Sequence, residues 1–234
     1  HFPELSRRYV TLLELGGSHV HNFRDLVDAL GIATLIIGDL DATVATKITD
    51  KNGQETTRWK SARPEQGKAQ QTANSVLKEW HPQKKLIDEL VALPAEGHGS
   101  TKGGDYELYV AYQKPVRVDG AAEGAALVIP RTFEDALILE NLPAVAKVEG
   151  SITSAKIRAI VAEGLSGDAL EDELFDLLKT AEKAAFALDC LMLEDPKALK
   201  PPSYIAAGLK WFEGAVGQDI LESEIKTGQA NGRD

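Results

Sequence analysis

Two carboxylates separated by one residue stand at the end of an apolar run, in the segment Leu35-Ile-Ile-Gly-Asp39-Leu-Asp41. Side chains alternate along an extended chain, so Asp39 and Asp41 leave the end of a strand on the same side. A second apolar run, residues 9–13, ends on Glu14 and is followed after one residue by two glycines. Oxygen ligands of this kind are the ones that Mg²⁺ and Mn²⁺ prefer. The spacing therefore predicts a divalent-metal site, with metal-assisted chemistry on phosphates as the leading hypothesis.

The elements expected to position these acids form a strand–helix–strand unit. Residues 9–14 are predicted to be the first strand. Residues 33–38 are predicted to be the second, because a continuous apolar run is typical of a strand buried on both faces of a parallel sheet. Between them, apolar residues at helical spacing end at Gly31. We interpret the unit as a right-handed β-α-β crossover.

The rest of the chain is predicted to alternate between strands, loops and helices. Thr132 is expected to begin a helix that ends near Glu140, with Asp135 three residues on as in a capping box. One long amphipathic helix is predicted at 168–191, and a last helix after Pro202. Further expected elements are strands at 106–113 and 125–129, short helices at 75–80 and 84–93, a flexible loop at 97–104 and a polar excursion at 42–75.

The composition bounds the class of protein. The chain has 234 residues, of which 43% are hydrophobic, so a packed core is expected. The single cysteine, Cys190, excludes a disulfide within the chain and a cysteine-rich zinc site, and fits a reducing, cytoplasmic location. No apolar run is long enough to span a membrane, and no signal peptide is visible. Because the chain begins with His1 rather than Met, we expect a fragment or a processed protein.

The charge is unevenly distributed along the chain. A net charge of −10 disfavours a passive nucleic-acid binder, but residues 47–85 carry nine basic and four acidic residues. This basic segment has two interpretations, a solvated surface or a patch that contacts phosphates beside the acidic site. Trp59 lies among the basic residues and is a candidate for stacking on a base. The candidate DNA-contacting residues are Trp59, Lys60, Arg63 and Lys68.

These motifs together resemble the C-terminal region of OLD-family nucleases (overcoming lysogenization defect), whose catalytic domain is of the Toprim type. A strand that ends in Glu before glycine, followed by a strand that ends in Asp-x-Asp, is the Toprim hallmark. The resemblance covers nearly the whole chain in the same order. It is carried by Tyr9-Val-Thr-Leu-Leu-Glu14-Leu-Gly-Gly, Gly38-Asp-Leu-Asp41, Val110-Ala-Tyr-Gln113, Arg131-Thr-Phe-Glu-Asp-Ala136, Phe186-Ala-Leu188 and Pro202-Ser-Tyr-Ile-Ala-Ala-Gly-Leu209-Lys-Trp211.

The resemblance implies an α/β fold, a Toprim-like and mostly parallel sheet flanked by helices with an additional helical subdomain. The Toprim catalytic core is expected at 1–140, including a basic excursion at about 42–104. A helical region at 141–226 is expected to pack on this core and to contribute Lys183. Residues 227–234 are expected to form a frayed tail.

The resemblance also implies a function, that of an Mg²⁺- or Mn²⁺-dependent DNA endonuclease that nicks and cuts by two-metal phosphodiester hydrolysis. Two divalent ions about 4 Å apart activate a water molecule and neutralise the leaving oxygen. The implied catalytic residues are Glu14, Asp39, Asp41, Glu134 and Lys183, with Thr132 as a further metal ligand. Some family members carry a second glutamate where this chain has Ser18, a poorer ligand, so the candidates to complete the second metal site are Ser18, a water molecule, or a neighbour such as His19 or Asp25. Asp135 is a candidate ligand in place of Glu134.

Partners outside this chain are implied as well. Full-length OLD proteins begin with a region that resembles ABC-type ATPases, and this chain contains no Gly-x-x-x-x-Gly-Lys-Ser/Thr loop. We therefore expect the nuclease half of an ATPase–nuclease, with the N-terminal ATPase region as a partner. DNA is the expected substrate, phage defence is the expected setting, and a helicase-like protein is a further expected partner.

Other interpretations stay open at this level. Asp39 and Asp41 are also typical of helix starts and turns, Thr132 of a simple helix cap, and Lys183 of a solvated ion pair. The sequence does not distinguish which of the adjacent acids Glu134 and Asp135 is the metal ligand. Alternative functions are a primase-like or topoisomerase-like Toprim enzyme, a receiver-like phosphotransfer domain and a non-catalytic interaction domain.

Overall fold

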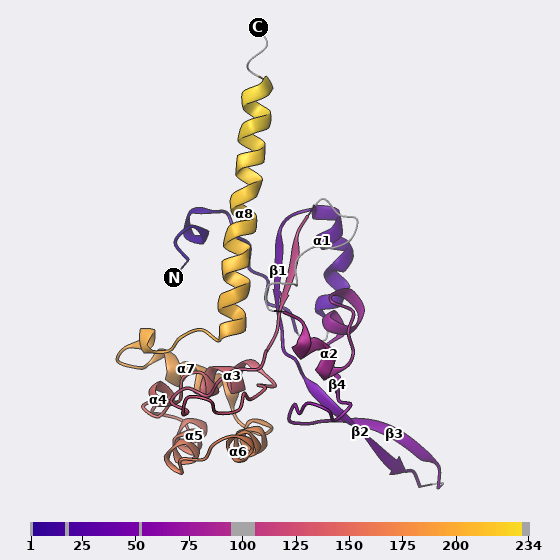
Figure 1. Ribbon diagram of the computed structural model, residues 1–234, viewed down its shortest axis with the longest axis vertical. Helices are drawn as coiled ribbons and strands as arrows, with labels where there is room; N and C mark the ends of the chain where they lie inside the picture. The colour runs from indigo at the N-terminus through magenta and orange to yellow at the C-terminus, as the bar shows by residue number, and fades with distance from the viewer. Residues whose placement is uncertain (1, 17–18, 52, 95–105, 231–234) are drawn as a thin grey trace.

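The structure is a computed structural model that describes residues 2–16, 19–51, 53–94 and 106–230. In chain order the elements are η1 (Leu5–Arg7), η2 (Val20–Phe23), α1 (Arg24–Leu30), β1 (Thr34–Ile37), β2 (Ala42–Thr49), β3 (Glu55–Ser61), β4 (Gln71–Thr72), the π-helical turn η3 (Val76–Trp80), α2 (Ile87–Ala92), β5 (Leu108–Ala111), α3 (Phe133–Leu139), α4 (Leu142–Val145), α5 (Ile152–Ala162), α6 (Asp168–Leu178), α7 (Lys183–Leu191), η4 (Pro196–Ala198) and α8 (Ser203–Ala230). Figure 1 shows a small sheet between α8 and α1, with α3 to α7 gathered beyond one end of that sheet.

The sheet that organises the chain is the parallel pair β1–β5, in which Ile37 lies opposite Ala111. Alternate residues of β5 serve opposite faces of this sheet. Leu108 and Val110 join an apolar cluster with η3 and α2, while Tyr109 and Ala111 pack against α8. Helices therefore cover both faces, and all four β5 residues are buried. The predicted Toprim-like α/β class is confirmed, but the described strands divide into this parallel pair and a three-stranded antiparallel sheet, so they do not form the one mostly parallel sheet that was expected.

Helix boundaries with a local sequence signal are confirmed. Helix α1 ends at Gly31, which adopts φ +60° and donates its N–H to Val27 O. Helix α3 is capped by Thr132, whose backbone N–H donates to Asp135 Oδ2 at 3.0 Å in the predicted capping box. Helix α8 starts directly after Pro202.

The predicted first strand at residues 9–14 is wrong, because this segment lies outside every helix and strand. Tyr9 is 98% exposed and Leu12 is 90% exposed. An apolar run becomes a strand only where a sheet edge accepts its hydrogen bonds and its side chains. Among the described residues, β1 pairs with β5 instead, so the parallel crossover runs from β1 forward to β5 rather than from residues 9–14 to β1.

The strand predicted at residues 125–129 is also wrong. This segment contributes only one isolated antiparallel bridge, between Val116 and Val128. Pro115 and Pro130 flank the bridge, and a proline offers no N–H to extend a ladder of hydrogen bonds. Val128 is buried all the same, in the apolar cluster of the helical region.

The long helix predicted at 168–191 is two helices, α6 and α7, separated at residues 179–182. Both pack on one apolar cluster, through Leu174 and Leu178 of α6 and Phe186 and Cys190 of α7. The apolar spacing therefore continues across the break, and no glycine or proline marks it. As a result Lys183 is the first residue of a new helix.

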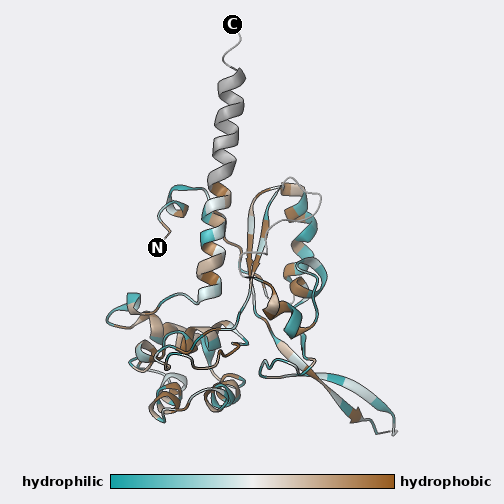
Figure 2. Cartoon of the chain, in the orientation of Figure 1, coloured by the Kyte–Doolittle hydropathy of each residue, from teal (hydrophilic) through white to brown (hydrophobic). Residues whose placement is uncertain are grey.

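The polar segment that had no assignment forms an antiparallel sheet with strand order β3-β2-β4. Its hairpin β2–β3 projects away from the remaining elements (Figure 1) and is largely hydrophilic to neutral, in contrast to the brown residues of the parallel sheet (Figure 2). All seven β3 residues are exposed, so the usual alternation of buried and exposed residues is missing from β3. The predicted loop at 97–104 lies outside the described residues. No helix in the described part of the chain is both long and apolar enough to cross a membrane.

Candidate active site

Asp39 lies just beyond β1 and connects three segments of the chain. Its Oδ1 accepts a hydrogen bond from Gln113 Nε2 at 2.8 Å and another from the backbone N–H of Phe133 at 2.9 Å. Gln113 follows β5, and Phe133 is the first residue of α3. The carboxyl ends of the two parallel strands and the start of α3 therefore meet at this carboxylate.

Asp41 is the second acid of the predicted pair, and it is held from two sides. Its Oδ1 lies 2.7 Å from Nη2 of Arg131. Its backbone adopts φ +47°, a left-handed conformation that is uncommon for a residue with a side chain. Hydrogen bonds from Asp41 N to Arg131 O and from Ala73 N to Asp41 O hold this turn between β1 and β2. Non-glycine residues in this conformation are concentrated at functional sites.

Glu134 and Lys183 are in direct contact. Glu134 Oε2 lies 2.8 Å from Lys183 Nζ and accepts a hydrogen bond from Thr132 Oγ1 at 2.9 Å. Thr132 is buried, and Glu134 stands in the first turn of α3. The starts of α3 and α7 thus bring together two residues that the family resemblance implies for catalysis.

Asp135 faces a different environment from its neighbour Glu134. It is buried, and its Oδ2 accepts hydrogen bonds from the backbone N–H groups of Arg131 and Thr132 at 3.0 Å. Burial raises the pKa of the Asp135 carboxyl, and the two backbone donors oppose this shift. Asp135 therefore completes the capping box of α3, whereas Glu134 contacts Lys183.

The electrostatics of the site favour a bound cation. Burial, assisted by the negative charges of Asp41 and Glu134, raises the pKa of Asp39 from 3.8 to about 6, while Gln113 and Lys183 oppose the shift. The carboxylates of Asp41 and Glu134 lie close enough to affect the ionisation of Asp39, so a positive charge is stabilised in this region. The donor set of Asp39, Asp41, Thr132 and Glu134 consists of oxygens, which suits Mg²⁺ or Mn²⁺.

The site is not closed around a metal position, however. Within the described residues no group of three or more histidine, cysteine, aspartate and glutamate side chains is arranged to hold an ion. Each of the three carboxylates instead contacts a protein donor, namely Gln113, Arg131 or Lys183. The chemistry of the donors fits a divalent cation, and a cation at Glu134 requires that this carboxylate exchange Lys183 for it.

Glu14 is not part of this arrangement. It is exposed, and among the described residues no hydrogen bond or ion pair joins it to Asp39, Asp41 or Glu134. Ser18, the candidate for a second ligand on the same segment, lies outside the described residues. Since the predicted strand at 9–14 is absent, the element that was expected to aim Glu14 at the site is absent too.

The structure adds polar residues that the sequence analysis did not assign to the site. Gln113 is 0% exposed; besides its bond to Asp39 it accepts from Leu40 N at 2.6 Å and donates to Tyr204 Oη at 3.2 Å. Arg131, which contacts Asp41, precedes the α3 cap. Gln113, Arg131 and Tyr204 all occur in segments that carry the family resemblance, and a buried polar residue at the carboxyl end of a parallel strand was the available signal.

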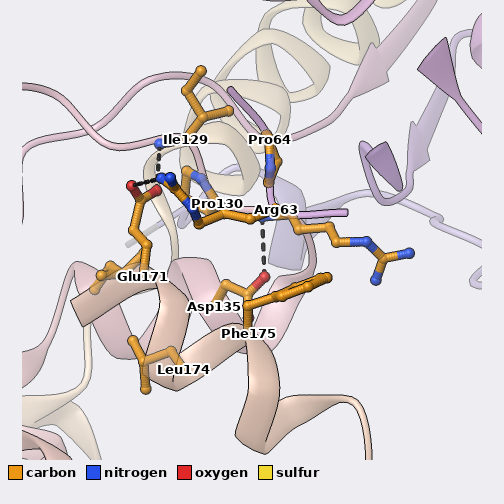
Figure 3. A pocket seen from close by; sticks show the side chains of 10 residues that line it. Arg63, Pro64, Ile129, Pro130, Asp135, Glu171, Leu174 and Phe175 are labelled. Atoms are coloured by element: carbon orange, nitrogen blue, oxygen red, sulfur yellow. Dashed lines mark hydrogen bonds and ion pairs between the residues drawn. The ribbon is translucent and has the colours of Figure 1, made fainter. Parts of the chain in front are cut away.

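The basic candidates have different surroundings. Trp59 is 47% exposed on β3, and Lys60 and Lys68 are exposed. The Arg63 side chain is only 13% exposed, and its Nη1 lies 2.9 Å from Glu171 Oε2. Glu171 Oε1 also accepts from Ile129 N at 3.0 Å (Figure 3). Further carboxylates near Arg63 are those of Glu65, Asp168 and Asp172. Arg63 is therefore engaged within the protein, between the end of β3 and α6.

Comparison with known proteins places this architecture in a class. A family model described as the TOPRIM domain of overcoming lysogenization defect protein-like proteins matches residues 1–41, the segment that contains Glu14, Asp39 and Asp41. The α/β fold is consistent with a Toprim-like domain, and the matched segment includes β1 and the two acids that follow it. The resemblance to the Toprim nuclease region of OLD-family proteins is thereby confirmed.

A curated relative is also similar to this chain. Endonuclease GajA of Bacillus cereus (strain HuB5-5) is 24% identical over 219 residues, which cover 89% of this chain and 28% of GajA. The chain therefore spans less than a third of the length of that relative. No solved structure gives a significant match.

Proposed function

We propose that this chain is the nuclease part of a metal-dependent DNA endonuclease, which nicks and cuts DNA by hydrolysis of phosphodiester bonds. The observation that carries the proposal is the meeting of Asp39, Asp41, Glu134 and Lys183, from three distant segments, at one edge of the parallel sheet. The similarity to a protein described as an endonuclease supports the reaction class.

The proposed metal ligands are Asp39, Asp41 and Glu134, with Thr132 adding a hydroxyl and Glu14 approaching from its exposed segment. Two Mg²⁺ or Mn²⁺ ions bound there would supply an activated water and neutralise charge on the leaving oxygen. Gln113 and the Phe133 N–H hold the Asp39 carboxylate in place. The capping box, through Asp135, fixes the first turn of α3 and with it the position of Glu134.

Lys183 is proposed to act on the phosphate. A cation held by Glu134 would displace the lysine, and the ammonium group at the start of α7 would then be free to bind a phosphate oxygen as a point charge. A cation aimed at the charge that develops in the transition state stabilises that state more than the ground state. In this proposal, the ammonium group of Lys183 binds the substrate phosphate only after its ion pair with Glu134 is broken.

The setting of this activity is proposed from the resemblance and from the share of GajA that the chain covers. An N-terminal ABC-type ATPase region would complete the protein, a helicase-like protein would act beside it, and phage defence would be its role. A non-catalytic interaction domain is the alternative that the first experiment separates from a nuclease.

The test is cleavage of supercoiled plasmid by the purified chain in Mg²⁺, Mn²⁺, Ca²⁺ or EDTA. Nicked and linear products are expected with Mg²⁺ or Mn²⁺ and none with EDTA, and Asp39→Ala is expected to abolish both products. The matched control is Glu173→Ala, which removes an exposed acid of α6 and is expected to cleave normally. Cleavage that persists in Asp39→Ala, or none in the unaltered chain, would contradict the proposal.

A further inference from the structure

The β2–β3 hairpin has two chemically different faces. Residues directly opposite each other in an antiparallel pair lie on the same face, and the next pair lies on the other. Thr43–Ser61, Ala45–Trp59 and Lys47–Thr57 form one face, which we call the Trp59 face. Val44–Lys60, Thr46–Arg58 and Ile48–Thr56 form the other, which we call the Arg58 face.

The Trp59 face is the one continuous with the candidate active site. Nη2 of Arg131 lies 2.7 Å from Asp41 Oδ1 and donates to Ser61 Oγ at 3.3 Å. Nε of the same guanidinium lies 3.4 Å from Ala42 O at the start of β2. Arg131 therefore joins the acidic site to the base of the hairpin on the side where Ser61 points.

Trp59 is the next residue on that face toward the tip of the hairpin, about 7 Å beyond Ser61 at the rise of a β-strand. Trp59 is 47% exposed and stands opposite Ala45, whose side chain is too small to cover the indole. An exposed aromatic ring of this size offers a flat surface on which a nucleic-acid base stacks, whatever the base. The hairpin projects from the rest of the molecule, so the surface is accessible (Figure 1).

We propose that the Trp59 face binds the DNA strand that runs outward from the acidic site, with the indole stacked on an unpaired base. The inference rests on the proposed nuclease function and adds a substrate class to it, DNA with a single-stranded or frayed segment next to the cleavage point. It also divides the basic residues: Arg58 and Lys60 lie on the opposite face and contribute general attraction to phosphates, not the stacking contact.

The experiment measures binding of fluorescein-labelled oligonucleotides to the full chain in Ca²⁺, where cleavage is not expected. One probe is a duplex with a single-stranded overhang and the other is the same duplex fully paired. Trp59→Ala is expected to weaken binding of the overhang probe about tenfold and to change binding of the paired probe less than threefold. Trp59→Phe, which keeps an aromatic ring, is expected to retain most of the affinity.

Arg58→Ala is the matched control from the other face. It is expected to weaken both probes to the same extent and to reduce the salt dependence of binding, as a phosphate contact does. An equal effect of Trp59→Ala on both probes, or no effect on either, overturns the inference. The nuclease proposal is tested separately, and it stands if the unaltered chain cleaves plasmid. If Trp59→Ala changes the oligomeric state without loss of DNA affinity, the Trp59 face serves self-association, and the inference of a DNA contact is overturned as well. If the unaltered chain neither binds nor cleaves DNA, both proposals fail.

Discussion

The ammonium group of Lys183 lies 2.8 Å from Oε2 of Glu134, a residue 49 positions earlier in the chain. The contact exists because the helical region breaks at residues 179–182, so that Lys183 stands in the first turn of α7. Glu134 stands in the first turn of α3. Two helix starts thus face each other beside the end of β1, and the break that the sequence did not indicate is the feature that places the lysine.

Replacement of this lysine separates metal binding from catalysis. Lys183→Ala removes a cation from beside Glu134, so the affinity for Mn²⁺ is expected to stay unchanged or to rise. The rate of plasmid nicking is expected to fall at least a hundredfold, the size typical for loss of one group that stabilises transition-state charge. Calorimetric titration with Mn²⁺ and a nicking time course measure the two effects. A fall in metal affinity as large as that of Asp39→Ala would refute this role for Lys183.

Asp39 is predicted to lower the stability of the metal-free protein at neutral pH. Its pKa is about 6 in the folded chain against 3.8 when unperturbed, so between these values the folded state binds more protons than the unfolded state. The free energy of unfolding therefore decreases as the pH rises through this window and is lowest above it. The loss is at most about 3 kcal/mol, since one pKa unit corresponds to about 1.4 kcal/mol.

Asp39→Asn tests this relationship. An asparagine oxygen still accepts the bonds from Gln113 and Phe133 but carries no charge. In EDTA the variant is expected to unfold at a higher temperature than the unaltered chain at pH 7.5 and at nearly the same temperature at pH 4. The same proton competes with a metal ion, so Mn²⁺ affinity of the unaltered chain is expected to fall as the pH drops below 6. A variant that is less stable than the unaltered chain at pH 7.5 contradicts the assignment.

The parts of the site that could be predicted are those with a local signal. Asp39 and Asp41 follow an apolar run, Thr132 precedes a capping-box acid, and Gly31 ends a helical pattern. Each signal depends on a few neighbouring residues, and each corresponds to the element found. Glu134 and Lys183 came from the family resemblance, and their contact could not be read from the spacing alone.

The parts that could not be predicted depend on contacts between distant segments. The pairing of Gln113 with Asp39 spans 74 residues, and that of Arg63 with Glu171 spans 108. From the sequence, Arg63 is one more cation in a basic stretch, and only the fold brings the acidic α6 beside it. The strand predicted at residues 9–14 is wrong for the same reason, because an apolar pattern does not specify which sheet edge is open to pair with it.

Arg63 is predicted to stabilise the fold and not to contact DNA. Arg63→Ala leaves the buried Glu171 without its cation, and loss of one partner of a buried ion pair costs about 3 kcal/mol. Burial already raises the pKa of Glu171 to about 7, so the variant is expected to lose more stability at pH 8 than at pH 6, where Glu171 takes up a proton. Urea unfolding at the two pH values measures this difference.

The control for Arg63 is Lys60→Ala on β3, whose side chain is exposed. That variant is expected to keep its unfolding midpoint and to bind DNA with a weaker dependence on salt. Arg63→Ala is expected to lower the unfolding midpoint and to leave the salt dependence of DNA binding unchanged. An unchanged midpoint together with a reduced salt slope in Arg63→Ala would return Arg63 to the set of phosphate contacts.

Gly208 is predicted to set the distance between α8 and the parallel sheet. A Cβ atom at this position would lie 3.0 Å from Ala111 Cβ and 3.0 Å from Leu35 Cδ1, whereas one at Gly214, further along the same helix, would meet nothing within 4 Å. Gly214→Ala is therefore expected to stabilise the chain by up to about 1 kcal/mol through helix propensity alone.

Gly208→Ala is expected to destabilise the chain by about 1 kcal/mol or more, because the new methyl group overpacks the contact with β1 and β5. Since Tyr204 on α8 contacts Gln113, which holds Asp39, Gly208→Ala is also expected to slow plasmid cleavage, while Gly214→Ala is not. Equal gains in unfolding temperature for the two variants would show that α8 does not rest on the sheet in this way.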